Sequence, residues 1–380
     1  MPKYVLLTAW APRCFGEDAT LLASSMPHIY NFAAGPAALP DPVRERLASL
    51  FAVPDDFAPS LLEQSHRGPR FLDIAARLRS SLRRHLGLDE EFEVLLMAGG
   101  SQLQFAMLPM NLAAGQPVAY VESGHWSAMA IDQARPVADV RVVFSGRPSN
   151  FTALPAIADV PGDAAYLHYC SNETVHGVQF AAPPASPVPV IADLSSELFS
   201  RPFPFASLGG LYACTQKNLG IPGLTVVALR RDLIERAPAT LPGMLSYRAW
   251  AAADSMPNTP STPAWIVAVE MLDWLEREGG VAAMGTRSAR KAETLYACID
   301  RHALYRCPVD RTARSQMNAV FRLADPAREP AFLAAAAEAG LVGLEGHRAV
   351  GGIRVSLYNA ISQEAVDTLV QFMDHFAGQG

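Results

Sequence analysis

The sequence predicts an α/β protein whose large domain is built on a mostly parallel sheet and is followed by a smaller α+β domain. Between residues 90 and 230, short apolar runs bounded by Gly, Pro, Asp and Asn alternate with helical patterns. Buried parallel strands linked by crossover segments have this appearance. After residue 280 a long helical stretch leads into strand and helix patterns of α+β order. At 380 residues, the chain is long enough for two domains.

Six apolar runs are the candidate strands of the large domain, each bounded by turn-forming residues. They are Glu93–Met97, Val118–Val121, Ala165–Tyr169, Val188–Ala192, Gly210–Ala213 and Thr225–Leu229. The segment Pro263–Gly279 has apolar residues at helical spacing and ends in glycines, so we expect an amphipathic helix whose Trp and Met side chains belong to the core.

The smaller domain is predicted from residue 286 to residue 380. A long helix over Val281–His302 leads into it, and its expected strands and helices are Asn318–Leu323, Gly352–Leu357, Ala331–Ala339 and Gln363–Phe376. The large domain then covers residues 26–285, and its first residues are able to pack on the small domain. Residues 1–25 form a disordered or spurious extension in this interpretation.

Composition and charge narrow the functional class. Half of the residues are hydrophobic and 18% are charged, as in a globular protein with a sizeable core. The formal net charge is −6 without a basic block, which argues against nucleic-acid and membrane partners. Apolar runs fall far short of the about 18 residues of a membrane span. Five scattered cysteines without a CxxC pair favour the reducing cytoplasm, so we expect a cytoplasmic enzyme.

A glycine corner after the first predicted strand is the first candidate ligand site. The segment EVLLMAGGSQLQF runs from a strand through Gly99 and Gly100 into an apparent helix near Ser101. Glycines allow the backbone to approach a ligand closely, and a helix N-terminus favours an anion. The segment is neither a Walker A loop nor a GxGxxG fingerprint. An anion cradle and a plain strand–turn–helix corner therefore both stay open.

Asp193 and Lys217 follow two later strands. Asp193, in VIADLS, lies at a strand end where open α/β sheets bind ligands, although an Asp there also serves as a helix N-cap. Lys217, in GLYACTQKNLG, is either a solvated loop residue or a semi-buried amine that forms an imine with a carbonyl cofactor. One crossover and one strand separate the two residues, which can place both at one sheet edge. Pyridoxal phosphate (PLP) needs such a lysine, such an acid and an anion cradle.

Aromatic and basic residues complete the candidate site. Trp126, after the strand Val118–Val121, either stacks on a flat cofactor ring or belongs to the core. His125 and His168 show no metal-binding spacing, so we expect no metal site.

Two His-Arg pairs point to the substrate. His66-Arg67 lies before a helix, and His347-Arg348 is followed by Arg354 beside glycines. Arginine binds carboxylate and phosphate with a two-pronged fork. The set predicts a small substrate with two anionic ends, although solvated surface arginines would have the same spacing.

In this order, the motifs give a specific resemblance. From Tyr30 to about Phe376 the chain resembles the phosphoserine aminotransferases, class-V aminotransferases of PLP fold type I. The fold implied is a large domain with a mostly parallel seven-stranded sheet and a smaller α+β C-terminal domain. The cradle departs from some members in having fewer glycines and no arginine. The matching segments are NFAAGPAALP, SHRG, AGGSQLQF, HYCSNETVHG, ADLSSELFSRP, TQKNLG, PNTPSTPAW and GHRAVGGIRVSLYNA.

The resemblance implies a role for each matched residue. Lys217 is similar to the Schiff-base lysine, and Asp193 is similar to the partner of the pyridinium nitrogen. Trp126 resembles the ring-stacking aromatic and Thr174 the partner of the cofactor's phenolic oxygen. The implied cofactor-phosphate contacts are Ser101, Gln102 and Gln216, with Asn258 and Thr259 from the neighbouring subunit of a homodimer. The implied substrate contacts are Arg354 for the α-carboxylate, with His66, Arg67, His347 and Arg348 for the phosphate.

The activity implied is reversible transamination between L-glutamate and 3-phosphohydroxypyruvate. It gives 2-oxoglutarate and O-phospho-L-serine in L-serine biosynthesis, and formation of 4-phosphohydroxy-L-threonine for pyridoxine biosynthesis stays open. One alternative is another small-substrate transaminase or lyase of the same fold, such as a cysteine desulfurase, which the His-Arg pairs disfavour. A second is a catalytically inactive dimeric scaffold, which the intact Lys217 and Asp193 disfavour.

Overall fold

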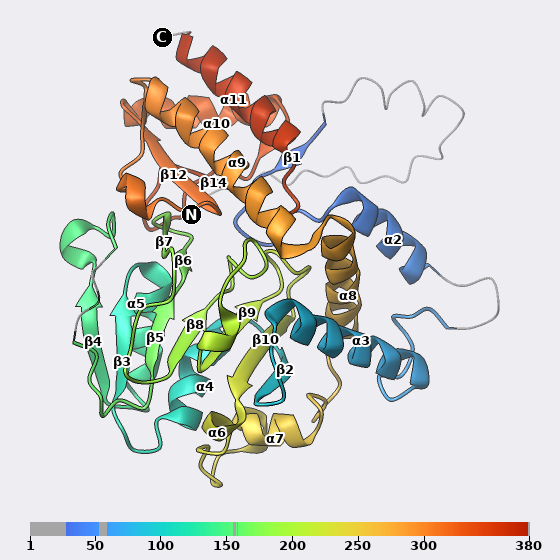
Figure 1. The fold of residues 1–380 in the computed structure, drawn as a ribbon. Coiled ribbons are helices and arrows are strands. Elements are labelled where there is room, and N and C mark those ends of the chain that lie inside the picture. The colour runs from blue at the N-terminus through green and yellow to red at the C-terminus, as the bar shows by residue number, and fades with distance from the viewer. Residues whose placement is uncertain (1–27, 53–58, 155–156, 158, 379–380) are drawn as a thin grey trace, which may run out of the picture.

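The computed structural model of this chain describes residues 28–52, 59–154, 157 and 159–378. The expected extension at residues 1–25 lies outside these described residues. The chain forms a lower lobe around a seven-stranded sheet and an upper lobe of helices and a three-stranded sheet (Figure 1). The α/β class predicted from the sequence is confirmed. Among the described residues, no helix is long and apolar enough to cross a membrane.

The large sheet is mostly parallel. In spatial order its strands are β2 (Phe92–Ala98), β10 (Leu224–Arg230), β9 (Gly210–Cys214), β8 (Val190–Asp193), β5 (Leu167–Cys170), β3 (Val118–Glu122) and β4 (Val140–Ser145). β10 alone runs in the opposite direction to the other six strands. The six predicted strands are all present. The edge strand β4 was not among them, because several of its side chains face solvent and its apolar run is interrupted.

Helices cover both faces of this sheet. Alternate strand residues such as Val94 and Leu96 pack on one helical layer, and the intervening Leu95 and Met97 pack on the other. The first layer consists of α2 (Asp41–Phe51), α3 (Pro69–Leu86) and α8 (Thr262–Arg277). The second consists of α4 (Gln102–Leu112), α5 (His125–Ala134), α6 (Arg231–Ile234) and α7 (Tyr247–Ala252). The predicted helix after Pro263 is α8, and its tryptophans are buried in the core as expected.

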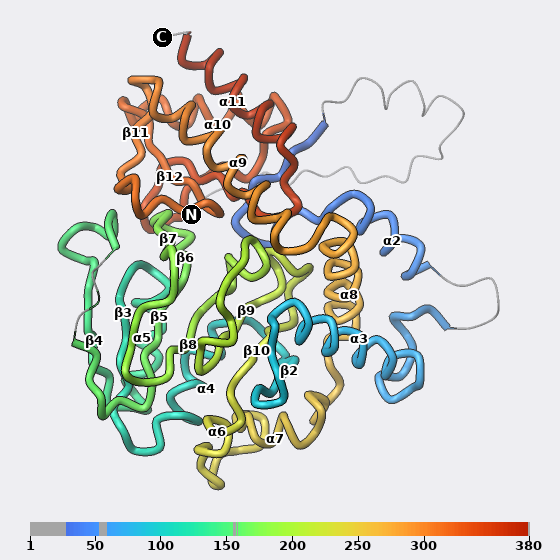
Figure 2. The backbone as a smooth tube through the Cα atoms, in the orientation of Figure 1, coloured from blue at the N-terminus to red at the C-terminus, as the bar shows by residue number. Residues whose placement is uncertain are grey.

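The upper lobe has its own hydrophobic cluster, and α9 (Gly280–Arg301) leads into it (Figure 2). Its antiparallel sheet consists of β11 (Tyr305–Arg306), β12 (Asn318–Leu323) and β14 (Ile353–Ser356), with α10 (Glu329–Glu338) and α11 (Gln363–Gly378). The start of the described chain joins this lobe, because β1 (Tyr30–Asn31) pairs with β13 (Leu341–Val342). We propose that the domain boundary falls near residue 285, in the first turns of α9.

The topology brings six strand ends to one edge. Because β10 alone is reversed, the carboxyl ends of β2, β3, β4, β5, β8 and β9 all meet at the edge that faces the upper lobe. Gly99 follows β2, Gly124 follows β3, and Lys217 lies three residues after β9. Cys170 and Asp193 are the last residues of β5 and β8. Open α/β sheets bind their ligands at such an edge.

Candidate active site

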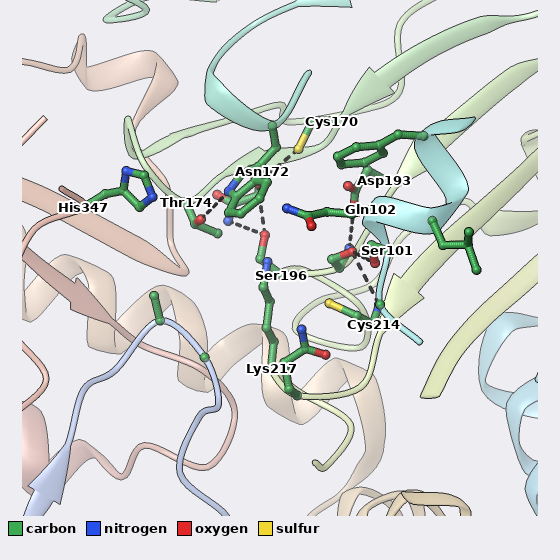
Figure 3. Close-up of a pocket in the computed structure, with 18 of the residues that line it drawn as sticks. Ser101, Gln102, Cys170, Asn172, Thr174, Asp193, Ser196, Cys214, Lys217 and His347 are labelled. Carbon is green, nitrogen blue, oxygen red and sulfur yellow. Dashed lines mark hydrogen bonds between the residues drawn. The ribbon is translucent and has the colours of Figure 1, made fainter. Parts of the chain in front are cut away.

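A cavity of about 620 Å³ opens at this edge between the two lobes. In Figure 3, Ser101, Asp193 and Cys214 lie on one side of the cavity, and Thr174 and His347 lie on the other. The structure thus brings together nine of the residues predicted from the sequence. They are Ser101, Gln102, Trp126, Thr174, Asp193, Gln216, Lys217, His347 and Arg354.

Asp193 presents a buried carboxylate to the cavity. Its Oδ1 accepts the backbone N–H of Ser195 at 2.9 Å. Burial raises the pKa of Asp193, while the charge of Lys217, the Ser195 contact and the hydroxyl of the neighbouring Tyr212 stabilise the carboxylate and oppose the rise. A buried acid of this kind stays ionised when a cation faces it. A protonated ring nitrogen of a cofactor would be such a cation.

Two buried residues behind Asp193 were not predicted as part of the site. Tyr212 lies opposite Asp193 in the β8–β9 register, and its hydroxyl is 2.9 Å from Nε2 of His168 on β5. Burial lowers the pKa of His168 to about 3, so this imidazole is neutral, and its Nδ1 has no partner. Because Nδ1 has no acceptor, the tautomer that leaves no N–H unpaired carries its proton on Nε2. In this tautomer His168 Nε2 donates to the Tyr212 hydroxyl, which is then free to donate to Asp193. We call these two residues the Tyr212–His168 relay.

Lys217 follows β9 and lies opposite Trp126. Its Nζ is 5.8 Å from the centroid of the indole ring. Burial lowers the pKa of Lys217, but Tyr358, Cys214 and Asp193 outweigh this effect and raise it to about 12. The amine is therefore held as an ammonium while Asp193 has no other cation beside it.

The glycine corner lines another part of the cavity. Gly100, Ser101 and Gln102 all line it, and α4 begins at Gln102 without an acidic residue in its first turn. The first N–H groups of a helix have no acceptor within the helix and attract anions. A Cβ added at Gly100 would meet no atom within 4 Å, so the loop borders open space. The Oγ of Ser101 lies 2.7 Å from the Oγ of Ser195, which ties the corner to the segment after β8. This geometry favours the anion cradle over a plain corner.

Trp126 is fixed by a carboxylate that the sequence analysis did not single out. Its indole N–H donates to Thr174 Oγ1 at 2.8 Å. The backbone N–H groups of Trp126 and Ser127 donate to the two oxygens of buried Glu173 at 2.9 and 2.8 Å. Glu173, on β6 (Asn172–Glu173), therefore caps the N-terminus of α5. An added Cβ at Gly124 would lie 2.4 Å from Cδ of Glu173, so this capping contact requires glycine.

A buried polar network joins the two lobes behind the cavity. The side-chain amide of Asn172 donates to Ser196 Oγ and to Asn318 Oδ1, both at 2.8 Å. Asn318, on β12, donates in turn to Ser356 Oγ at 3.1 Å. Because Asn172 and Ser196 line the cavity, this network fixes one wall of the site against the upper lobe.

Arg354, on β14, brings a cation from the upper lobe into the cavity. Burial lowers the pKa of its guanidinium, and its Nε is a buried donor without an acceptor. An unused donor on a guanidinium fits a carboxylate ligand, which accepts two parallel hydrogen bonds.

Five predicted site residues do not line this cavity. His66 and Arg67 lie in the turn before α3, and Asn258 and Thr259 lie between α7 and α8. Arg348 is exposed beside His347. The resemblance implies that Asn258 and Thr259 contact the cofactor phosphate in the active site of the neighbouring subunit. This role stays a prediction.

The cysteines of the cavity do not resemble a desulfurase nucleophile. Cys170 and Cys214 are buried at the ends of β5 and β9, and both are free thiols. Burial raises the pKa of Cys170, whose thiol donates to the carbonyl oxygen of Asn172. A reactive cysteine needs a lowered pKa and access to solvent.

Comparison with known proteins places the chain in a family. The family model of the class-V aminotransferases matches residues 29–369. A phosphoserine aminotransferase of Coxiella burnetii is 42% identical over 361 residues, covering 92% of this chain and 99% of that protein. One from Laribacter hongkongensis is 44% identical over 353 residues, covering 92% and 98%.

Solved structures of phosphoserine aminotransferases are similar to this chain over almost its whole length. The phosphoserine aminotransferase of Bacillus circulans subsp. alkalophilus superposes with a TM-score of 0.90 at 41% identity, over 93% of this chain and 99% of that one. The PLP-bound phosphoserine aminotransferase of Trichomonas vaginalis gives 0.87 at 35% identity, over 91% and 100%.

The fold and the cavity define a PLP-dependent transaminase of the class-V aminotransferases. The cavity fits the cofactor, because Lys217, Asp193, Trp126 and the Gly100–Gln102 cradle converge in it. Within this class, the chain belongs to the phosphoserine aminotransferase family.

Proposed function

We propose that the chain transfers an amino group reversibly between L-glutamate and 3-phosphohydroxypyruvate, forming 2-oxoglutarate and O-phospho-L-serine for L-serine biosynthesis. The observation that carries this proposal is one cavity that faces Lys217 and Asp193 with two basic residues of the upper lobe, Arg354 and His347. The first pair suits amino transfer through PLP, and the second pair suits a substrate with two anionic ends.

The residues divide the chemistry between them. Bound PLP supplies an aldehyde for the amino group and a ring that accepts electrons from the substrate Cα. Asp193 would balance the charge of the ring nitrogen, and Trp126 would pack against the ring. The Gly100–Gln102 cradle holds the cofactor phosphate with helix N–H groups. Lys217 Nζ removes the proton from the substrate Cα as a general base. It then delivers a proton, as a general acid, to the carbon that receives the amino group.

Substrate selection belongs to the upper lobe. Arg354 binds the α-carboxylate that glutamate and phosphoserine share. His347 and Arg348 bind the phosphate, with His66 and Arg67 as further phosphate contacts. A substrate without the phosphate leaves these donors unpaired, which is costly in a desolvated site.

We also propose a homodimer with shared active sites, in which Asn258 and Thr259 reach the cofactor phosphate of the neighbouring subunit. Its partners are small molecules, without nucleic acid or membrane, and its compartment is the cytoplasm. The acidic net charge of −6 and the free thiols of the described cysteines support these assignments.

An absorbance spectrum of the PLP-loaded protein tests the function. Addition of O-phospho-L-serine alone should convert the visible band of bound PLP to the shorter-wavelength band of its amine form. A band that ignores phosphoserine and responds to L-alanine would keep the transaminase and overturn the substrate. A protein that binds no PLP would favour the inactive scaffold.

The phosphate contacts have a separate test. Arg348→Ala should raise the KM for O-phospho-L-serine about tenfold or more, since a charge-assisted hydrogen bond is lost, and should change the KM for L-glutamate little. Equal effects on both substrates would place the phosphate elsewhere.

A further inference from the structure

Two imidazoles, one from each lobe, form the wall between the active-site cavity and a second cavity. The second cavity measures about 530 Å³ and is lined by His125 of α5 and by Ala349 and Val350. His347, from the loop that carries Ala349 and Val350, lines the first cavity. The ring centroids of His125 and His347 are 4.9 Å apart. His125 directly precedes Trp126 in the sequence, but it is not among the residues assigned to cofactor or substrate binding.

The groups around this pair are mainly cationic or neutral. From the upper lobe, the charge of Arg348 lowers the pKa of His125, and the charges of Arg354 and Arg348 lower the pKa of His347. His176, between β6 and β7 (Val178–Gln179), lines the second cavity beside His125.

The remaining charged groups at the second cavity are Asp132, on α5, and Arg147. The Nε of Arg147 is 2.6 Å from a carboxylate oxygen of Glu122, so its charge is already balanced. At the N-terminus of α5, buried Glu173 is engaged by the backbone N–H groups of Trp126 and Ser127. Among the described residues that line the second cavity, Asp132 is therefore the acid that offsets the cations beside the pair.

Without a bound anion, both imidazoles are neutral. Burial lowers the pKa of His125, and Arg348 lowers it further. Burial also lowers the pKa of His347, with further contributions from His125, Arg354 and Arg348. Two imidazoles in contact cannot both carry a proton at low cost, since like charges at this separation disfavour each other.

We propose that His125 and His347 act as a proton-accepting pair that recognises the dianionic phosphate of the substrate, so that His125 is a further specificity-determining residue. This inference rests on the proposed function. A phosphate dianion beside His347 and Arg348 reverses the local charge. An opposite charge within about 4–6 Å raises the pKa of an imidazole by about one to three units. One proton then moves from solvent onto the pair, and the imidazolium is shared across the wall between the cavities.

This arrangement discriminates by charge. The dianion of a phosphate monoester, whose second pKa is about 6, stabilises the added proton. The side-chain carboxylate of glutamate carries one negative charge and stabilises the proton less. The sign of the pH dependence follows, because a pKa that rises on binding means proton uptake. The contribution of this proton to the affinity is full below the pKa of the free pair, decreases as the pH rises from there to the pKa of the bound pair, and is lost above it.

The test measures protons directly and does not require turnover. Isothermal titration calorimetry at pH 7.5 in buffers of different ionisation enthalpy gives the number of protons taken up per ligand bound. The probes are 3-phosphoglycerate, which has a phosphate and a carboxylate but no amino group, and glutarate, which has two carboxylates. The PLP-loaded protein is compared with His125→Phe, which keeps an aromatic ring against His347 without an ionisable group. A matched control is His85→Phe, which removes a partly buried histidine on α3 next to Phe199, outside the linings of both cavities.

We expect the unmodified protein to take up about half a proton to one proton per 3-phosphoglycerate and close to none per glutarate. His125→Phe should abolish most of this uptake and weaken 3-phosphoglycerate binding about tenfold, with glutarate binding within about twofold of the unmodified protein. His85→Phe should behave as the unmodified protein.

Uptake that persists in His125→Phe would overturn the pair and leave the proposed function standing. Binding of 3-phosphoglycerate without any uptake by the unmodified protein would do the same. Failure of the unmodified protein to bind 3-phosphoglycerate, while it binds glutarate, would overturn the phosphorylated substrate and the pair together.

Discussion

The Tyr212–His168 relay predicts a specific loss of cofactor affinity in Tyr212→Phe. The substitution removes the Tyr212 hydroxyl, which stabilises the Asp193 carboxylate as a donor in the relay, and leaves the Ser195 N–H at 2.9 Å in place. A hydrogen bond to a charged group contributes about 1.5–3 kcal/mol. At 1.36 kcal/mol per pKa unit, the pKa of Asp193 should rise by about one to two units. The charge pair with a protonated ring nitrogen weakens accordingly, so we expect the Kd for PLP to rise about 10- to 100-fold.

The same substitution also destabilises the fold, for a separable reason. His168 loses the partner of its Nε2, and its Nδ1 already has none, so a fully buried imidazole is left without a hydrogen bond. Such a group costs about 1–3 kcal/mol. A second variant, Tyr212→Phe combined with His168→Leu, removes the stranded imidazole. It should regain stability relative to the single variant and should keep the weakened PLP affinity.

The assays are titration of the apoprotein with PLP, followed by absorbance, and urea unfolding of the apoprotein. Tyr166→Phe is the matched control, because Tyr166 is equally buried and its hydroxyl pairs with Tyr120 at 3.0 Å. It should lose about 1–3 kcal/mol of stability, because the buried Tyr120 hydroxyl loses its partner, and should bind PLP normally. Unchanged PLP affinity in Tyr212→Phe would refute the relay, as would recovery of affinity in the double variant.

Three further predictions follow from the site. Lys217→Ala should fold and still bind PLP, but should lose transamination about 100- to 10,000-fold or more in single-turnover assays, since the proton carrier is gone; full activity would contradict its role. Gly124→Ala should lower the melting temperature and quench or shift the fluorescence of Trp126, because the new Cβ would lie 2.4 Å from Glu173 Cδ; unaltered fluorescence and stability would argue against the capping contact. Arg354→Lys should raise the KM for glutamate and for phosphoserine by a similar factor, about 10- to 100-fold, since both share the α-carboxylate; an effect confined to one substrate would place the carboxylate elsewhere.

Elements with a strong local pattern were predictable from the sequence. The inner strands are short apolar runs that turn-forming residues delimit, and the strand ends carry Asp193 and the glycine corner where a parallel sheet binds ligands. The edge strand β4 was not predicted, because exposure of one face removes the apolar run that is typical of a buried strand.

Residues whose function depends on a distant partner were not predictable. Glu173 and Trp126 are 47 residues apart in sequence, and nothing local marks Glu173 as the cap of another segment's helix. Tyr212 and His168 are separated by 44 residues and look like ordinary strand residues. Their roles emerge only when parallel strands align them behind Asp193.

The pairing of β1 with β13 has a consequence for synthesis of the protein. Ala34 and Gly35 line the cavity just after β1, and the carbonyl oxygen of Ala34 accepts the hydroxyl of Tyr358 at 2.9 Å. The partner of Tyr30 in the strand pair is Leu341, 341 − 30 = 311 residues later. At a synthesis rate of about 5–20 residues per second, Leu341 is made about 15–60 s after Tyr30. The first residues of the cavity to leave the ribosome are thus among the last to take their place in it, and a nascent chain that stops before β13 has the large sheet but an unfinished cavity.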